Sequence, residues 1–198
     1  MNLEKPPFDK RNLWSWVAIA VVFVGTAILL RLEGRLWICS CGTFQLWSGN
    51  ICSSDNSQHL LDPYSLTHLL HGFLFFWMVA LLVKLLLKRL RPAWQFVLAI
   101  AVEALWEVFE NTDFIINRYR SETAALGYIG DTVVNSFGDI LCCAIGFLIA
   151  RRLGVRWSLI VFAVLELVLI FWIKDSLLLE IVMLIFSVDA IRAWQMCR

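Results

Sequence analysis

The chain has 198 residues, of which 60% are hydrophobic and 17% are charged, and its mean hydropathy is +0.74. Soluble domains carry about 45–50% apolar and about 25% charged residues, so this composition places the chain in a membrane. The net charge is only +1, and no basic run stands outside the membrane flanks, which argues against nucleic acid as a partner.

Six apolar runs predict an all-α bundle of about six transmembrane helices, forming a single integral membrane domain over residues 1–198. A helix needs about 20 apolar residues to cross the hydrocarbon core. In chain order the runs are Leu13–Leu30, Leu66–Leu87, Pro92–Phe109, Thr132–Ala150, Trp157–Ile173 and Ser176–Ile191. The first run lacks a small-residue cleavage site, so we interpret it as a retained helix and not a signal peptide. The last run is the shortest, and we assign its Glu180 and Asp189, like Glu166 before them, to helix packing.

The lysines and arginines at the ends of these runs predict an orientation. With a cytoplasmic amino terminus, the inner flanks hold Lys5, Lys10, Arg11, Lys88, Arg89, Arg91, Arg151, Arg152, Arg156, Arg192 and Arg198. The outer flanks hold fewer, namely Arg31, Arg35, Arg118, Arg120 and Lys174. The positive-inside rule therefore favours a bacterial inner-membrane protein with both termini in the cytoplasm and periplasmic loops over about 32–65 and 110–131.

Three polar clusters interrupt the apolar runs, and this topology brings all of them to the outer leaflet. They are His68 with His71, then Glu103, Glu107 and Glu110, and finally Asp131, Asn135 and Asp139. Within each cluster the helical spacing puts the residues on one face. A charge in the hydrocarbon core costs about 2.5–3.5 kcal/mol unless it faces a partner, water or a cation. The convergence predicts a functional site that faces the periplasm.

These residue types suit two kinds of chemistry. A divalent metal ion accepts imidazole and carboxylate ligands, and the expected ligands are His68, His71, Glu107 and Asp131. Buried acids whose pKa values are pushed apart suit proton transfer, and the expected catalytic groups are Glu103, Glu107, Glu110, Asp131, Asn135 and Asp139. Taken singly, either histidine also fits a contact with lipid headgroups, Asp131 fits a helix cap, and Glu110 fits a solvated helix end.

The two outer loops add further candidates. Arg118, Tyr119 and Arg120 follow the glutamate stripe, where they would either hold an anionic headgroup such as phosphate or pair with the neighbouring acids. In the longer loop, a disulfide between Cys52 and either Cys39 or Cys41 is expected outside the inner membrane, which leaves one of the three cysteines over.

Several strings resemble a family of bacterial multi-pass inner-membrane proteins that carries only an unknown-function label. They are Cys39–Gly42, Ser57–His59, Asp62–Phe73, Trp106–Asn111, Asn117–Arg120, Gly130–Asp139, Lys174–Ser176 and Asp189–Gln195. The spacing of Asp131, Asn135, Asp139 and Gly146 is more loosely similar to VanZ-like membrane proteins. Neither resemblance implies a particular reaction.

The leading hypothesis is an enzyme that acts on a lipid or lipid-linked headgroup at the outer leaflet. Its expected partners are therefore membrane lipids. The alternatives are a small ion-coupled carrier or permease, and a non-enzymatic structural or assembly factor with a buried polar network. A carrier is disfavoured because the inner halves of the same helices are apolar and the chain shows no internal repeat.

Overall fold

The computed structural model describes residues 12–123 and 127–196, and within them the only regular elements are helices. They are α1 (Leu13–Leu32), α2 (Ser65–Leu85), α3 (Pro92–Glu110), α4 (Asp113–Glu122), α5 (Val133–Ile173), α6 (Leu177–Phe186) and α7 (Asp189–Gln195). Four of them, α1, α2, α3 and α5, are long and apolar enough to cross a membrane. The prediction of an all-α membrane bundle is confirmed.

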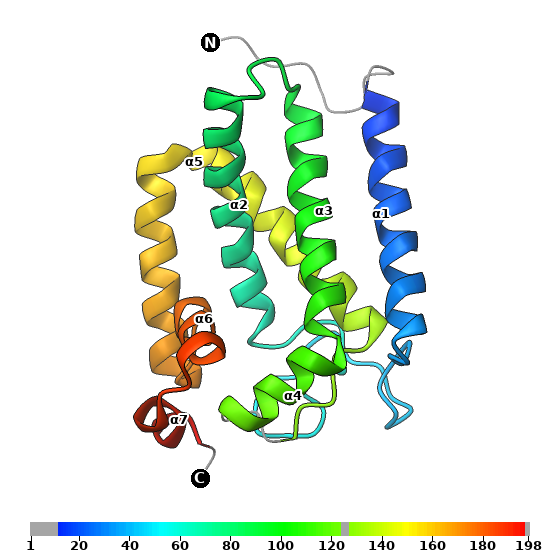
Figure 1. Ribbon diagram of the computed structural model, residues 1–198, viewed down its shortest axis with the longest axis vertical. Helices are drawn as coiled ribbons and strands as arrows, with labels where there is room; N and C mark the ends of the chain where they lie inside the picture. Colours follow the sequence, from blue (N-terminus) through cyan, green and yellow to red (C-terminus); the bar gives the residue numbers. More distant parts are fainter. Residues whose placement is uncertain (1–11, 124–126, 197–198) are drawn as a thin grey trace.

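Helices α1, α2 and α3 run side by side along the long axis, and α5 begins beside α1, crosses behind α3 and α2 and then turns back (Figure 1). The turn falls at Gly154, whose φ of 72° and ψ of 170° interrupt the 41-residue helix. Glycine adopts positive φ at little steric cost, so this position accommodates the reversal. The two halves of α5 correspond to the expected spans 132–150 and 157–173.

The structure differs from the expected sixth span, residues 176–191. This segment forms α6, which has 10 residues, and then α7 after a break at Ser187, whose φ is 46°. A helix of 10 residues is about 15 Å long, half the thickness of the hydrocarbon core. Counting the two halves of α5 separately, the described chain thus has five apolar helical segments long enough to cross a membrane. The start of α1 and helix α7 lie at opposite ends of the bundle (Figure 1). The expected common side for both termini depended on six crossings and does not follow from this arrangement.

Helix α2 packs closely on the first half of α5, and two glycines make the close approach possible. A Cβ atom on Gly72 would overlap the carbonyl oxygen of Cys143, and one on Gly146 would overlap that of Leu69. Small residues allow membrane helices to approach at backbone distance. The contact fixes α2 against α5 directly beside the polar stretch that begins with His68.

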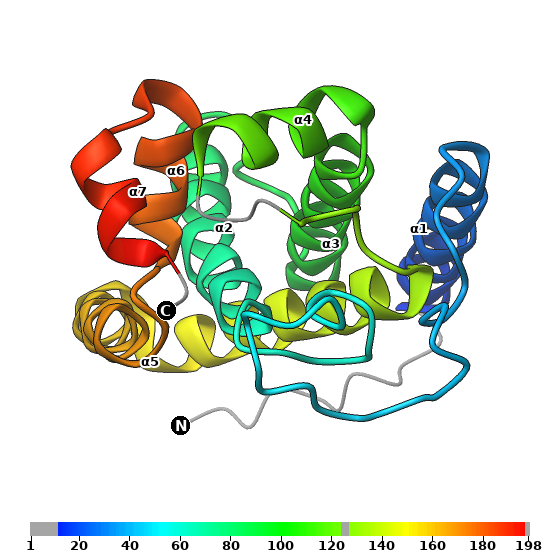
Figure 2. The same ribbon diagram turned by 90° about the horizontal axis from the view of Figure 1, so that it is seen from below.

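The short helices gather at one end of the bundle. Seen from that end, α4, α6 and the first half of α5 surround the ends of α2 and α3, while α1 stands at the edge (Figure 2). Helix α4 begins at a cap in which the Thr112 side chain accepts a hydrogen bond from the backbone N–H of Ile115. The expected loop 110–131 therefore contains a helix that lies across the polar end of the bundle.

Candidate functional site

A cavity of about 820 Å³ lies at this end, between α2, α3, α4, α5 and α6. Polar side chains line one part of it: Ser57, Tyr64, Thr67, His68, His71, Glu110, Tyr119, Tyr128, Asp131, Asp139, Asp175 and Glu180. Apolar side chains also line it, among them Leu74, Phe75, Val102, Leu105, Trp106, Phe109, Ile181 and Leu184. Cavities of about 300–1,000 Å³ hold small organic ligands, so both the size and the mixed lining suit an amphipathic molecule.

Glu103 joins both histidines of α2 to α3. Nδ1 of His68 donates to Oε1 of Glu103 at 2.6 Å, and Nδ1 of His71 lies 3.1 Å from Oε2 of the same carboxylate. The Glu103 side chain is fully buried, whereas those of His68 and His71 are 9% and 12% exposed. The carboxylate thus fixes the orientation of two imidazoles that both line the cavity.

Glu107, one turn further along α3, has no such partner. Its Oε1 lies 3.1 Å from Nδ1 of His68 but off the direction in which that nitrogen donates. Both Glu107 oxygens are buried without a hydrogen bond from any described residue. Glu110 has one partner, because the Tyr119 hydroxyl donates to its Oε1 at 2.8 Å, and its Oε2 is buried without one.

Besides Cys39, Cys41 and His59 in the outer loop, where the two cysteines are joined in a disulfide, two groups of donor atoms lie close enough to hold a metal ion. One donor atom each from His68, His71 and Glu103 lie within 4.8 Å of one another, and the same holds for His68, Glu107 and Glu110. Three of the four residues expected as ligands therefore belong to these groups. Asp131, the fourth, belongs to neither.

Asp131 is held by its neighbours. Asn111 Nδ2 donates to its Oδ2 at 2.8 Å, and the Tyr128 hydroxyl donates to its Oδ1 at 2.9 Å. Burial raises the pKa of Asp131 above its usual range. The helix cap suggested as an alternative for Asp131 is instead Thr132, whose Oγ1 accepts from the backbone N–H of Asn135 at 3.2 Å.

Asn135 and Asp139, the other two residues of the third polar cluster, have different surroundings. Asn135 faces the outer loop, where its Nδ2 donates to the carbonyl oxygen of His59 at 2.9 Å, and it does not line the cavity. Asp139 does line the cavity, although it is only 4% exposed. Its Oδ1 has no hydrogen-bond partner among the described residues. Of the two, only Asp139 can meet a bound molecule.

Arg118 and Arg120 do not line the cavity. Nε of Arg118 donates to the carbonyl oxygen of Leu184 at 2.9 Å, and Nε of Arg120 donates to that of Tyr128 at 2.5 Å. Tyr119 lies between them in sequence and does reach the cavity. No lysine or arginine is found among the described lining residues, whereas five carboxylates are, namely Glu110, Asp131, Asp139, Asp175 and Glu180. The lining as it stands favours neutral or cationic groups over a bare anion.

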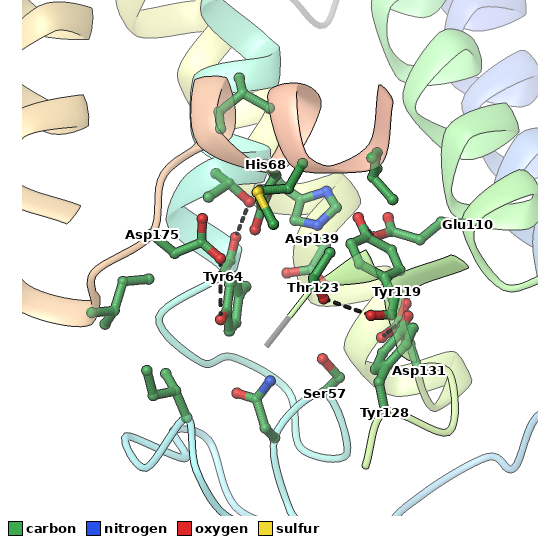
Figure 3. A pocket seen from close by; sticks show the side chains of 18 of the residues that line it. Ser57, Tyr64, His68, Glu110, Tyr119, Thr123, Tyr128, Asp131, Asp139 and Asp175 are labelled. Atoms are coloured by element: carbon green, nitrogen blue, oxygen red, sulfur yellow. Dashed lines mark hydrogen bonds between the residues drawn. The ribbon is translucent and has the colours of Figure 1, made fainter. Parts of the chain in front are cut away.

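Sequence reasoning missed several cavity residues, because their segments show no polar residues repeated at helical spacing. Tyr64 precedes α2 and Asp175 follows α5, and the Tyr64 hydroxyl is 3.5 Å from Oδ2 of Asp175. Figure 3 shows this pair on one side of His68 and the Glu110–Tyr119 pair on the other. Burial raises the pKa of Asp175 to about 7, and it raises the pKa of Tyr128 well above its usual value. Glu180, assigned to packing, also lines the cavity.

The cysteine pairing in the outer loop differs from the expected one. Cys39 is joined to Cys41, which leaves neither of them for Cys52. A tight turn brings the two together, since the backbone N–H of Gly42 donates to the carbonyl oxygen of Cys39 at 3.1 Å. Cys52 is engaged elsewhere, and its side chain lines the cavity.

These features define a multi-pass membrane protein with a polar cavity at one end of its helix bundle. The chain belongs to the family described as "Protein of unknown function (DUF2585)", whose profile matches residues 30–197. It is 44% identical over 187 residues to a UPF0314 protein of Sinorhizobium fredii, which covers 94% of this chain and 93% of that protein.

Two further relatives agree with this assignment. A UPF0314 protein of Rhizobium meliloti is 43% identical over 92% of this chain and 90% of its own length. One from Brucella anthropi is 38% identical over 97% of this chain and 95% of its own length. The expected resemblance to an uncharacterised bacterial membrane family is confirmed. No solved structure matches the chain.

Proposed function

We propose that this protein is a membrane-embedded enzyme that acts on the polar headgroup of a lipid or lipid-linked molecule. The observation that carries the proposal is the mixed lining of the cavity, in which imidazoles and carboxylates face the same space as many apolar side chains. An acyl or prenyl chain would contact the apolar side chains, and the headgroup would reach the polar residues. Headgroup chemistry then takes place without the lipid leaving the membrane.

Asp139 and His71 are the acid–base groups in this proposal. Oδ1 of Asp139 has no partner in the described structure, and His71 is oriented by Glu103 with its ring on the cavity wall. Positioned acids and bases accelerate reactions by about 10²–10⁴-fold. Tyr119 and Tyr128, whose pKa values burial raises well above normal, remain protonated, and their hydroxyls hold the carboxylates of Glu110 and Asp131 in place at the cavity wall.

The cavity end faces the periplasm in this proposal. The opposite end of the bundle holds the link between α2 and α3 and the turn of α5 at Gly154 (Figure 1). These two places carry the basic residues Lys88, Arg89, Arg91, Arg151, Arg152 and Arg156. The arginines at the cavity end are engaged with backbone carbonyls, as Arg35 is with Ile129 and Arg192 with Ser121. The positive-inside rule then puts the basic end in the cytoplasm and the cavity at the outer leaflet of an inner membrane.

An ion-coupled carrier is a weaker candidate, because the half of the bundle away from the cavity is closed by apolar packing. Val79, Ala99 and Phe147 form a buried cluster there, from α2, α3 and α5 respectively. A carrier needs polar groups or a water-filled path that continues through the membrane. The described residues form the polar site at one end only, as expected for an enzyme that opens to one leaflet.

The test is lipid profiling of cells that lack the encoding gene and carry either the wild type, Asp139→Asn or Asp113→Asn. Asp113 is the matched control, because it lies at the same end of the bundle with its side chain 92% exposed. We expect one lipid class to change in the deletion strain, to be restored by the wild type and Asp113→Asn, and to stay changed with Asp139→Asn. Identical profiles in all four strains would contradict the proposal.

A further inference from the structure

We infer that a divalent ion of the first transition row binds between His68, Glu107 and Glu110, at the polar end of the cavity. Binding of the ion stands on the geometry of these three residues alone. Its use in headgroup chemistry rests on the function proposed above.

The first step is the hydrogen-bonding capacity that the protein leaves unused at two glutamates. Both oxygens of Glu107 and Oε2 of Glu110 are buried and receive no hydrogen bond from the residues that the structure describes. A buried acceptor without a partner costs about 1–3 kcal/mol, and more when it is charged. Since the side chain of Glu107 is fully buried, no bulk water compensates it. A cation bound between the two glutamates would be coordinated by all three of these oxygens, which have no other partner among the described residues.

The second step is the choice between the two donor groups. In the group of His68, His71 and Glu103, the Glu103 oxygens already accept from both imidazoles. In the group of His68, Glu107 and Glu110, donor atoms lie within 4.8 Å of one another and three carboxylate oxygens are free of protein donors. The second group is therefore the one with coordination capacity left over.

The third step is the support around these ligands. Metal-binding histidines usually donate their second ring N–H to a carboxylate, which fixes the ring and strengthens the ligand. Glu103 takes this place, because Nδ1 of His68 donates to it at 2.6 Å. The Tyr119 hydroxyl orients Glu110 in the same way at 2.8 Å. The ligands are thus held by a second layer from α3 and α4.

The ligand set also indicates the class of ion. One imidazole with two carboxylates suits zinc, iron or manganese better than calcium or magnesium, which prefer oxygen alone. His68 and Glu110 line the cavity, so the ion has a route in. Once bound, it would supply the positive charge that the lining lacks and would let the cavity accept an anionic headgroup.

The experiment uses the full-length protein in detergent, stripped with a chelator and then titrated with Zn²⁺, Mn²⁺ or Co²⁺. We expect one ion per chain by elemental mass spectrometry, and a Co²⁺ absorption spectrum typical of nitrogen and oxygen ligands. Glu107→Gln and Glu110→Gln should lose the ion, and Glu103→Gln should bind it about 10–100-fold more weakly. The matched control is Glu166→Gln, since Glu166 is also buried in α5 with an unpartnered oxygen but lies outside both donor groups.

Thermal melting supplies a second readout that a structural role would not give. Without the ion, Glu107→Gln should melt higher than the wild type, because it removes a buried acidic group whose two oxygens receive no hydrogen bond. With the ion, the order should reverse, because only the wild type and Glu166→Gln gain stability by binding. A wild type that binds none of the three ions, or equal ion content in Glu107→Gln, would overturn the inference. An unaltered lipid profile with intact ion binding would count against the proposed function alone.

Discussion

Nδ1 of His68 on α2 donates to Oε1 of Glu103 on α3 across 2.6 Å, and Glu103 is fully buried. The same carboxylate receives His71, so one side chain of α3 orients two side chains of α2. This contact links the fold to the site, because it joins two membrane helices and sets the imidazoles against the cavity.

Replacing Glu103 should therefore cost stability. Glu103→Ala leaves two buried imidazoles without their acceptor, and breaking a buried pair in this way costs about 3–5 kcal/mol. Glu103→Gln keeps an acceptor oxygen and should lose less. Chemical unfolding in detergent, with a chelator present, measures both variants. Wild-type stability in Glu103→Ala would mean that the contact does not hold the helices together.

The contact between α2 and α5 should tolerate no added methyl group. Gly146→Ala and Gly72→Ala each put a Cβ into the backbone of the opposite helix, and such overpacking costs about 1–3 kcal/mol or more. Gly25→Ala in α1 is the control, because its Cβ would meet nothing within 4 Å. Melting temperatures of the three variants test this, and equal values in all three would argue against the close approach.

Stability should fall as the pH rises toward 7, in part through Asp175. Burial raises the pKa of Asp175 from 3.8 to about 7, so in this window the folded protein holds a proton that the unfolded chain has released. Stability from this group is then present at low pH and decreases as the pH passes from 3.8 to about 7. Asp175→Asn should flatten that part of the profile. A variant whose profile falls as steeply as the wild type's would show that Asp175 is not the group responsible.

The five apolar segments, each taken as one crossing, predict that the end of the described chain lies on the cavity side of the membrane. A reporter enzyme that is active only in the periplasm should therefore work when fused after Gln195, and a fusion after Arg89 should not. A fluorescent protein that matures only in the cytoplasm should give the opposite result. Fluorescence from the fusion after Gln195 would restore the six-span topology expected from sequence.

Composition and periodicity are sufficient to predict the helices and the convergence of the three polar clusters. The stripe of Glu103, Glu107 and Glu110 faces His68 and His71 because helical spacing fixes which face a residue occupies. The apolar run 176–191 predicts one helix, whereas the structure has a break at Ser187 between α6 and α7. Ser187 adopts a left-handed conformation there, which hydropathy does not reveal.

The lining of the cavity depends on contacts between distant segments. Tyr64 and Asp175 are 111 positions apart, and neither belongs to a stripe, so no local pattern pairs them. Arg118 and Arg120 were expected at the site from their position in the chain. The Arg118 guanidinium instead binds the carbonyl oxygen of Leu184, a contact that depends on the packing of α4 against α6. That of Arg120 binds the carbonyl oxygen of Tyr128, in the segment that follows α4.

The most direct test of the central claim is headgroup conversion by the purified protein in liposomes made from total bacterial lipids. We expect the wild type to change the mass of one lipid class, Asp139→Asn to slow this change by about 10²–10⁴-fold, and Asp113→Asn to leave it intact. A wild type that leaves every lipid unchanged, with or without added divalent ion, would contradict headgroup chemistry as the function.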